Sequence, residues 1–193
     1  SDPHPLLQNS GLQLSKDDNW EQAMYQAAHY ELVASALAVQ AGHAINPDFQ
    51  IGCMVAMCPI YPLTAKPADV MMAERAMQKR YWFGDVHCLG EYPKWLPKYF
   101  ERKGFDMDIT AADLATLKAG TVEYVGFSYY MSFVTKGRDG DSDYDFKEPD
   151  DFVENPYVEK SDWGWQIDPT GLRYAMNWMQ DLSLIHISEP TRP

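Results

Sequence analysis

Apolar and polar positions divide the chain into helical segments that alternate with short apolar runs. Over residues 20–45 apolar side chains recur at steps of three and four, as at Leu32, Ala36 and Val39, which predicts an amphipathic helix. Further helices are predicted over about residues 67–82, 110–120 and 168–180. The one over 110–120 begins at Thr110, with Asp113 at capping-box spacing and Gly120 at its end.

Two apolar runs without a helical period, residues 49–62 and 122–132, lie between these helices and predict strands. The first is expected to be buried on both faces. Helices that alternate with such strands indicate an α/β fold with a parallel sheet. Only two strong strands occur in 193 residues, which favours an arc of a (β/α)8 TIM barrel with long insertions over a doubly wound sheet.

The remaining segments are expected to be loops. Asp17 or Asp18 is expected to cap the first helix. Residues 85–105 mix proline, glycine and aromatic residues, which predicts a long loop containing a short helix. Residues 136–159 are rich in aspartate and glutamate without the spacing of a calcium loop, so a solvated surface loop is expected.

Charge and composition exclude several classes of partner. A net charge of −12 without a Lys/Arg-rich run argues against nucleic acid. No apolar run reaches the roughly 18 residues of a membrane span, so no membrane is expected. Three cysteines without a framework pattern are expected to be reduced thiols in a cytoplasmic protein. No cofactor fingerprint and no metal-ligand spacing occur, so neither a cofactor nor a metal is expected.

The candidate chemistry lies at the end of the second strand and in a tryptophan-bearing loop. Alternation places Ser128 and Tyr130 on one strand face, at the carboxyl end where barrel enzymes build their sites. A tyrosine whose hydroxyl bonds to a backbone carbonyl is an equal alternative. Trp163 and Trp165 flank Gly164 before the last helix; either could stack on a sugar ring, and at least one is expected to plug the loop onto the core.

The chain resembles glycoside hydrolase family 1, and within it the bacterial 6-phospho-β-glucosidases, over about residues 2–181. The resemblance rests on the following stretches: HPLLQNSGL, MYQAAHYELVASALAV, IGCMVAMCPIYPLTA, RYWFGDVHCLGEYP, VGFSYYMSF and NPYVEKSDWGWQIDPTGLRYA. It implies a single TIM-barrel domain of which residues 1–181 form a central fragment, containing roughly the fifth and sixth strands. Residues 182–193 resemble translated adapter sequence and are expected to be a non-native tail.

The resemblance implies retaining hydrolysis by two glutamates about 5 Å apart. No glutamate of this chain matches either family motif, so both are expected beyond the chain, which is expected to be inactive by itself. Tyr130 matches a tyrosine that hydrogen-bonds the nucleophile, and Trp165 matches a tryptophan that forms the aglycone platform. Ser128 stands where many members have asparagine, a departure that the 6-phospho-β-glucosidase branch shares.

The expected function is therefore part of a cytoplasmic 6-phospho-β-glucosidase. Such an enzyme hydrolyses a small sugar phosphate substrate, phosphorylated cellobiose or an aryl 6-phospho-β-glucoside, to glucose 6-phosphate and the aglycone. A 6-phospho-β-galactosidase, a plain β-glucosidase and a non-catalytic sugar-binding module remain alternatives. The resemblance leaves a homo-oligomer open for the full-length enzyme.

Overall fold

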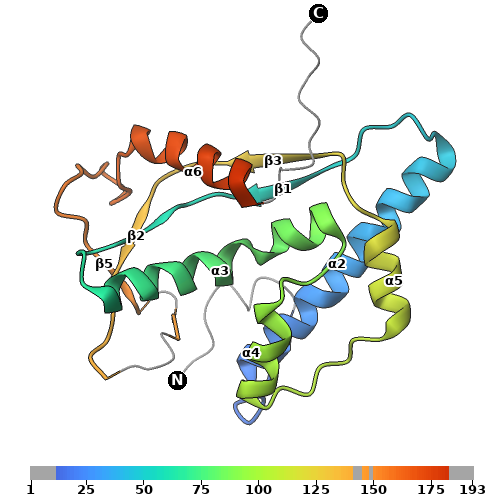
Figure 1. The fold of residues 1–193 in the computed structure, drawn as a ribbon, viewed down its shortest axis with the longest axis horizontal. Helices are drawn as coiled ribbons and strands as arrows, with labels where there is room; N and C mark the ends of the chain where they lie inside the picture. The colour runs from blue at the N-terminus through green and yellow to red at the C-terminus, as the bar shows by residue number, and fades with distance from the viewer. Residues whose placement is uncertain (1–11, 141–144, 148–149, 183–193) are drawn as a thin grey trace, which may run out of the picture.

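The computed structural model describes residues 12–140, 145–147 and 150–182 (Figure 1). In chain order the elements are α2 (Trp20–Ile45), β1 (Gly52–Ala56), β2 (Ile60–Pro62), α3 (Pro67–Leu89), α4 (Trp95–Lys103), α5 (Ala111–Ala119), β3 (Tyr124–Ser128), β4 (Phe133–Thr135), β5 (Phe152–Val153) and α6 (Pro169–Leu182). The predicted α/β class is confirmed, and the described residues form no closed barrel. No helix among them is long and apolar enough to cross a membrane.

The first predicted strand, 49–62, is interrupted once and forms β1 and β2; the second, 122–132, forms only β3, and β4 follows directly after the predicted range. The two stretches of chain run side by side in parallel. β1 pairs with β3 up to Ala56 opposite Ser128, and β2 pairs with β4 from Ile60 opposite Phe133. Four residue steps separate Ala56 from Ile60, and five separate Ser128 from Phe133, so the second strand carries one extra residue between the two pairs. The Phe133 amide donates to the Pro59 carbonyl at 2.8 Å, which keeps the strands in contact beyond the interruption.

Helix ends follow local capping chemistry, although one predicted capping residue was wrong. The Asn19 side chain caps α2 by accepting a hydrogen bond from the Gln22 amide at 3.2 Å, so the expectation of Asp17 or Asp18 was wrong. The Asp18 carboxylate instead accepts from the Ser15 amide in the preceding turn. The capping box at the start of α5 and the glycine at its end are confirmed. Helix α6 begins at Pro169, a position where the missing amide donor of proline costs no helical hydrogen bond.

Helix α3 is longer than the sequence pattern predicted. It continues to Leu89, so the first five residues of the expected loop, 85–89, are helical. Trp82 and Val86 are buried in the same core on either side of Gly84, and this packing outweighs the low helix propensity of glycine. The helix ends at Gly90, whose φ of 67° suits glycine. The short helix expected in the remaining loop is α4.

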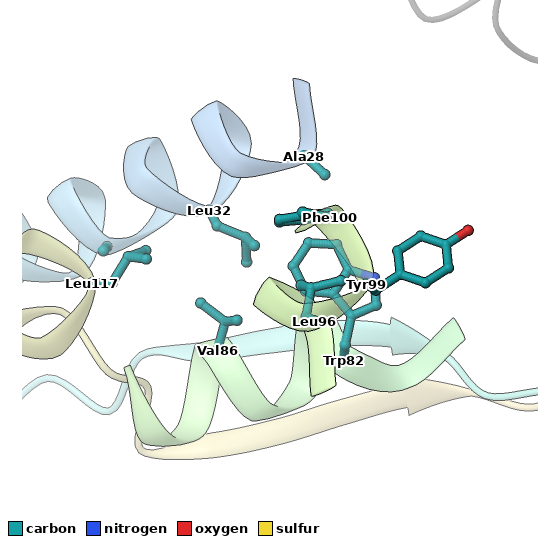
Figure 2. Packing of buried hydrophobic residues seen from close by; sticks show 9 residues of the cluster. Ala28, Leu32, Trp82, Val86, Leu96, Tyr99, Phe100 and Leu117 are labelled. Atoms are coloured by element: carbon teal, nitrogen blue, oxygen red, sulfur yellow. The ribbon is translucent and has the colours of Figure 1, made fainter. Parts of the chain in front are cut away.

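Two apolar cores hold these elements together. The first joins the four helices α2 to α5, and Figure 2 shows Leu32, Trp82, Val86 and Phe100 pointing toward one another from three of them. The second lies between the strands and the helices α3 and α6. The face of the second strand opposite Ser128 and Tyr130 packs on helices, because Val125, Phe127 and Tyr129 contact this second core.

The opposite face of the strand pair is open. Met54 is 68% exposed and Tyr124 is 51% exposed, so the expectation that the first strand is buried on both faces was wrong among the described residues. A continuous apolar run indicates that both faces of a strand are apolar. It does not show that the described residues supply side chains to cover both faces. The covered face is the one that carries Val55, which packs on the second core.

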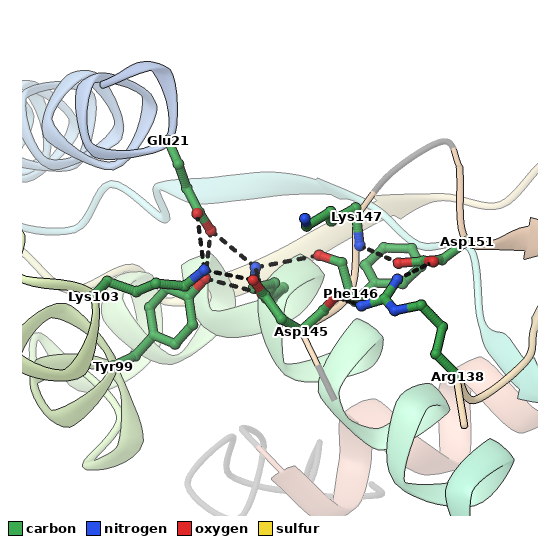
Figure 3. Close-up of polar contacts among 9 residues, drawn as sticks. Glu21, Tyr99, Lys103, Arg138, Asp145, Phe146, Lys147 and Asp151 are labelled. Carbon is green, nitrogen blue, oxygen red and sulfur yellow. Dashed lines mark hydrogen bonds and ion pairs between the residues drawn. The ribbon is translucent and has the colours of Figure 1, made fainter. Parts of the chain in front are cut away.

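Within the acidic segment 136–159, Asp145 and Asp151 pair with cationic side chains, as Figure 3 shows, so the expectation of a solvated surface loop was wrong at these two residues. The Asp145 carboxylate lies between Lys79, at 2.7 Å, and Lys103, and only 16% of the side chain is exposed. Burial raises the pKa of Asp145, but hydrogen bonds from Lys103 and Lys79 outweigh that effect and hold it at about 2. Asp151, whose side chain is 8% exposed, pairs with Arg138 of the same segment. Lys79 and Lys103 lie in distant segments, and local composition does not reveal their contact with Asp145.

Candidate functional site

Tyr130 and Trp165, both singled out from the sequence, are in contact. Their ring centroids are 5.7 Å apart with planes at 67°, an edge-to-face pair. Tyr130 lies two residues beyond the carboxyl end of β3, and Trp165 lies four residues before α6. The side chains are 60% and 46% exposed, so the pair presents aromatic surface instead of filling a core.

A tight hairpin positions Trp165. Lys160 and Gln166 form an antiparallel bridge, and the Ser161 amide donates to the Trp165 carbonyl at 2.9 Å. The Gly164 amide closes the turn by donating to the Ser161 carbonyl at 2.8 Å. Gly164 has a φ of 78°, a left-handed conformation that glycine adopts without steric cost. The turn therefore sets the direction in which the following tryptophan leaves the backbone.

The hairpin is tied to the interruption of the second strand through a buried polar pair. The Ser132 hydroxyl donates to the Gln166 Oε1 at 3.3 Å, and both side chains are buried. Ser132 lies two residues after Tyr130, and Gln166 directly follows Trp165, so this contact holds the two aromatic side chains together. The sequence analysis missed both residues, because a serine and a glutamine 34 positions apart carry no local signal of contact.

Ser128 and Trp163, the other two residues singled out from the sequence, have different surroundings. The Ser128 hydroxyl contacts the Met54 sulfur at 3.8 Å, on the open face of the strands. Trp163, at the tip of the hairpin, is 86% exposed. Since Trp165 is also substantially exposed, neither tryptophan plugs the loop onto the core, and that expectation was wrong. The tip of a short hairpin extends too far from the core for its side chain to reach back.

Behind the aromatic pair, two tyrosine hydroxyls meet at Asp168. Tyr61 donates to the Asp168 Oδ2 at 2.9 Å, and Tyr129 donates to the Asp168 carbonyl oxygen. The other carboxylate oxygen accepts from the Gly171 amide at 2.9 Å and so caps α6. Burial, followed by the nearby Asp168 charge, raises the pKa of Tyr129 to about 12. Burial and the hydrogen bond to Asp168 also raise the pKa of Tyr61. Both hydroxyls therefore stay protonated donors at neutral pH.

A cavity of about 420 Å³ opens next to this cluster. Its lining includes Tyr61, Asn155, Tyr157, Asp168 and Tyr174. The volume falls within the range of small-molecule sites, and an apolar lining with a few convergent polar groups is typical of them. Sequence reasoning missed Asp168, although a polar residue directly before Pro169 is the expected signal of a helix cap.

The described residues contain no group of three or more histidine, cysteine, aspartate or glutamate side chains arranged to hold a metal ion. Cys53, Cys58 and Cys88 are free thiols. Burial, with smaller contributions from Cys53 and Asp85, raises the pKa of Cys88 to about 11, so this thiol is protonated at neutral pH and a poor nucleophile.

Curated relatives match most of this chain but only part of their own length. The chain is 49% identical over 184 residues to the aryl-phospho-beta-D-glucosidase BglA of Bacillus subtilis, which covers 94% of this chain and 38% of that protein. It is 46% identical over 166 residues to a 6-phospho-beta-glucosidase of Dickeya chrysanthemi, which covers 85% of this chain and 35% of that protein. The chain thus spans little more than a third of the relatives it matches.

Solved structures show the same fold. The AHE enzyme of Alicyclobacillus herbarius superposes with a TM-score of 0.72 at 23% identity, covering 90% of this chain and 37% of that one. The family 1 β-glucosidase of Thermotoga maritima superposes with a TM-score of 0.67 at 21% identity, covering 84% and 35%. The model of glycosyl hydrolase family 1 matches residues 13–189. With the helices, parallel strands and aromatic pair all inside the matched range, the chain belongs to glycosyl hydrolase family 1.

Proposed function

We propose that the chain is a central segment of a retaining 6-phospho-β-glucosidase. The observation that carries the proposal is sequence identity of 46–49% to proteins named as phospho-β-glucosidases over 85–94% of this chain. The substrate would be a phosphorylated disaccharide or aryl glucoside, and the products glucose 6-phosphate and the aglycone. No cofactor is part of the proposal. Because such substrates are phosphorylated during uptake, we place the enzyme in the cytoplasm.

The proposal extends to the fold of the longer protein. The two interrupted parallel strands are proposed to be the fifth and sixth of a (β/α)8 barrel, with residues 1–181 as its central part. Three observations support this: the strands are parallel, the described helices cover one of their faces, and Met54 and Tyr124 are exposed on the other. In a barrel that open face is filled by side chains of the remaining strands. The non-native tail at 182–193 stays a prediction, since residues 183–193 lie outside the described residues.

The site residues take supporting roles in this proposal. Tyr130 would donate its hydroxyl to the nucleophilic carboxylate, Trp165 would form a platform for the aglycone, and Ser128 would lie beside them at the substrate. Their support is position: Ser128 and Tyr130 lie at or just beyond the carboxyl end of a parallel strand, where barrels carry their sites, and Trp165 contacts Tyr130. Both catalytic glutamates would be supplied by segments outside this chain, so the chain alone would be inactive.

Hydrolysis assays on the longer protein that contains this chain test the proposal. We expect turnover of p-nitrophenyl 6-phospho-β-glucoside and much weaker turnover of the unphosphorylated glucoside and of the 6-phospho-β-galactoside. Equal rates for the phosphorylated and unphosphorylated glucosides would point to a plain β-glucosidase, and a preference for the galactoside to the galactosidase alternative. Absence of turnover on all three, with sugar binding retained, would leave a binding module.

Substitutions at the aromatic pair test the proposed roles. Tyr130→Phe removes only the hydroxyl, and we expect kcat to fall about tenfold or more, since a charge-assisted hydrogen bond is typically worth 1.5–3 kcal/mol. Trp165→Ala is expected to raise KM for large aglycones more than for small ones. Trp163→Ala is the matched control, because its side chain lies on the same hairpin without the contact to Tyr130. A Trp163 effect equal to that of Trp165 would contradict the platform role.

A further inference from the structure

A second cavity, of about 140 Å³, lies between α3 and α4, away from the aromatic pair. The α3 side is formed by Arg75, Gln78 and Lys79, which share one helix face because they are three and four residues apart. The Lys79 ammonium group is fully used: it donates to Asp145, to Glu21 and to a backbone carbonyl. Lys79 therefore anchors the neighbouring acidic segment and has no donor left for a ligand.

Helix α4 contributes two cationic side chains, Lys98 and Arg102, and two aromatic rings, Trp95 and Tyr99, to the other side of the cavity. Trp95, Lys98, Tyr99 and Arg102 repeat at helical spacing along one face. The Arg102 guanidinium lies over the Tyr99 ring, 5.4 Å from its centroid, and the Trp95 and Tyr99 rings meet edge to face. Within residues 12–140, 145–147 and 150–182, neither Lys98 nor Arg102 forms an ion pair with a carboxylate.

Arg75 contributes a buried donor without an acceptor. Its Nη1 donates to the Gln78 side chain at 2.8 Å, but its Nε is buried and has no hydrogen-bond partner. A buried unsatisfied donor on a charged group is costly, and in native structures it commonly marks the place of a bound water or ion. The cavity that Arg75 lines brings a ligand next to the same guanidinium group, although the Nε itself is closed to solvent.

The charge around the cavity is positive although the whole chain has a net charge of −12. Five cationic side chains and three carboxylates form the cavity and its hydrogen-bonded neighbours: Arg75, Lys79, Lys98, Arg102 and Lys103 against Glu21, Glu74 and Asp145. The carboxylates of Glu21 and Asp145 are occupied by the two anchored lysines. The unneutralised charge therefore resides on Arg75, Lys98 and Arg102.

We propose that this cavity binds a small oxyanion, namely a phosphate group that is either free or carried by a small metabolite. The guanidinium groups of Arg75 and Arg102 suit a tetrahedral oxyanion because arginine binds phosphate through paired, directional donors, and Lys98 adds a point charge. A water molecule takes up about 30 Å³ in the liquid, so the space suits a phosphate group and leaves the rest of a larger ligand outside. The site is independent of the proposed catalytic role.

Calorimetric titration of the chain with inorganic phosphate, at constant ionic strength maintained with sodium chloride, tests the proposal. We expect saturable binding of one phosphate per chain, weakened at least tenfold in the double variant Arg75→Gln/Arg102→Gln. A second double variant, Lys98→Gln/Arg102→Gln, alters only exposed side chains, so folding is preserved, and should weaken binding at least fivefold. Arg173→Gln, at an exposed position on α6, is the control for loss of charge elsewhere and should change the affinity less than twofold.

Titration with glycerol phosphate distinguishes the source of the anion. Tighter binding of this monoester than of inorganic phosphate would assign the site to a phosphorylated metabolite, and tighter binding of inorganic phosphate would assign it to the free ion. Three results would overturn the proposal: no saturable heat with either probe, unchanged affinity in both double variants, or an equal loss of affinity in Arg173→Gln.

Discussion

On one side of the β1–β3 strand pair, Val125 and Phe127 pack against a core that α3 and α6 complete. On the opposite side, Met54 and Tyr124 are more than half exposed, and the Ser128 hydroxyl contacts the Met54 sulfur. The covered side carries the packing that stabilises the fold, while the residues with candidate chemistry lie on the open side or just beyond it. Substitutions on the two sides should therefore differ in what they change: stability on the first, and ligand interaction on the second.

The largest difference should come from matched truncations in a helix core and on the open face. Leu96 is fully buried among α2, α3 and α4, and Leu96→Ala should lower the free energy of unfolding by about 3 kcal/mol through lost burial and a residual cavity. Met54→Ala should change it by less than about 0.5 kcal/mol, because its side chain is already in solvent. Urea denaturation measures both, and equal losses would contradict the comparison.

The next largest effect is expected at Asp145, which ties the acidic segment to α3 and α4. Its folded pKa of about 2 lies below the ordinary value of 3.8, so it stabilises the fold above about pH 5, and this contribution is lost as the pH falls toward 2. Asp145→Asn should cost on the order of 2 kcal/mol at pH 7 and flatten the pH dependence between 5 and 2.

Asp139→Asn provides the control for this carboxylate. Asp139 also pairs with a lysine, Lys66, but its side chain is almost entirely exposed, and exposed pairs contribute little. Urea melts at pH 3, 5 and 7 compare the two variants. If the Asp139 and Asp145 variants lost the same stability at pH 7, the ion pairs of Asp145 in Figure 3 would stabilise the fold no more than an exposed ion pair does.

A stabilising change of smaller size is expected at Asp85, in the last turns of α3. Burial raises the pKa of Asp85 to about 6, and no hydrogen bond or ion pair compensates it among the described residues. A folded pKa above the ordinary 3.8 means that this carboxyl costs stability as the pH rises from about 4 through 6. A negative charge near a helix C-terminus is also unfavourable. Asp85→Asn should therefore stabilise the chain at pH 7 by roughly 1–2 kcal/mol.

The gain from Asp85→Asn should disappear below about pH 4, where the aspartate is already protonated in both states. Thermal unfolding at pH 4 and pH 7 measures this. A gain of equal size at both pH values would mean that helix propensity or packing, and not the buried charge, is responsible.

The smallest stability effect should fall on the hairpin. Trp165→Ala removes one edge-to-face contact with Tyr130 and should cost about 1 kcal/mol or less. Trp163→Ala removes no ring contact and should be neutral within about 0.5 kcal/mol. The melting temperatures of the two variants measure these effects. A loss of several kcal/mol in Trp165→Ala would show that the hairpin contributes to the stability of the fold as the covered side of the strands does.

Local chemistry was predictable from the sequence and long-range pairing was not. The cap formed by Thr110 and Asp113 depends on residues three apart, so their order along the chain is enough to predict it. The continuation of α3 past Gly84 depends on packing with other helices, which outweighs propensity. The ion pairs of Asp145 join segments 42 and 66 residues apart, and composition alone made that segment look solvated.

The candidate site shows the same contrast between residues that the sequence identifies and contacts that it does not. Tyr130 and Trp165 were singled out individually, from strand alternation and from the resemblance, but their contact required the fold. The buried Ser132–Gln166 hydrogen bond and the Tyr61–Asp168 hydrogen bond, which hold the surrounding segments, were missed. Polar residues that act through partners 34 and 107 positions away look like ordinary loop residues in a sequence.

The extra residue in the second strand has a consequence for motion. Residues 129–132 belong to neither ladder, since pairing stops at Ser128 and resumes at Phe133. Their amides should therefore exchange with solvent deuterium faster than the amides of β3 and β4 on either side. Tyr130 belongs to this rapidly exchanging segment. A ligand that ordered residues 129–132 would slow exchange there first. Protection of these four amides would then report occupancy of the site without any measurement of turnover.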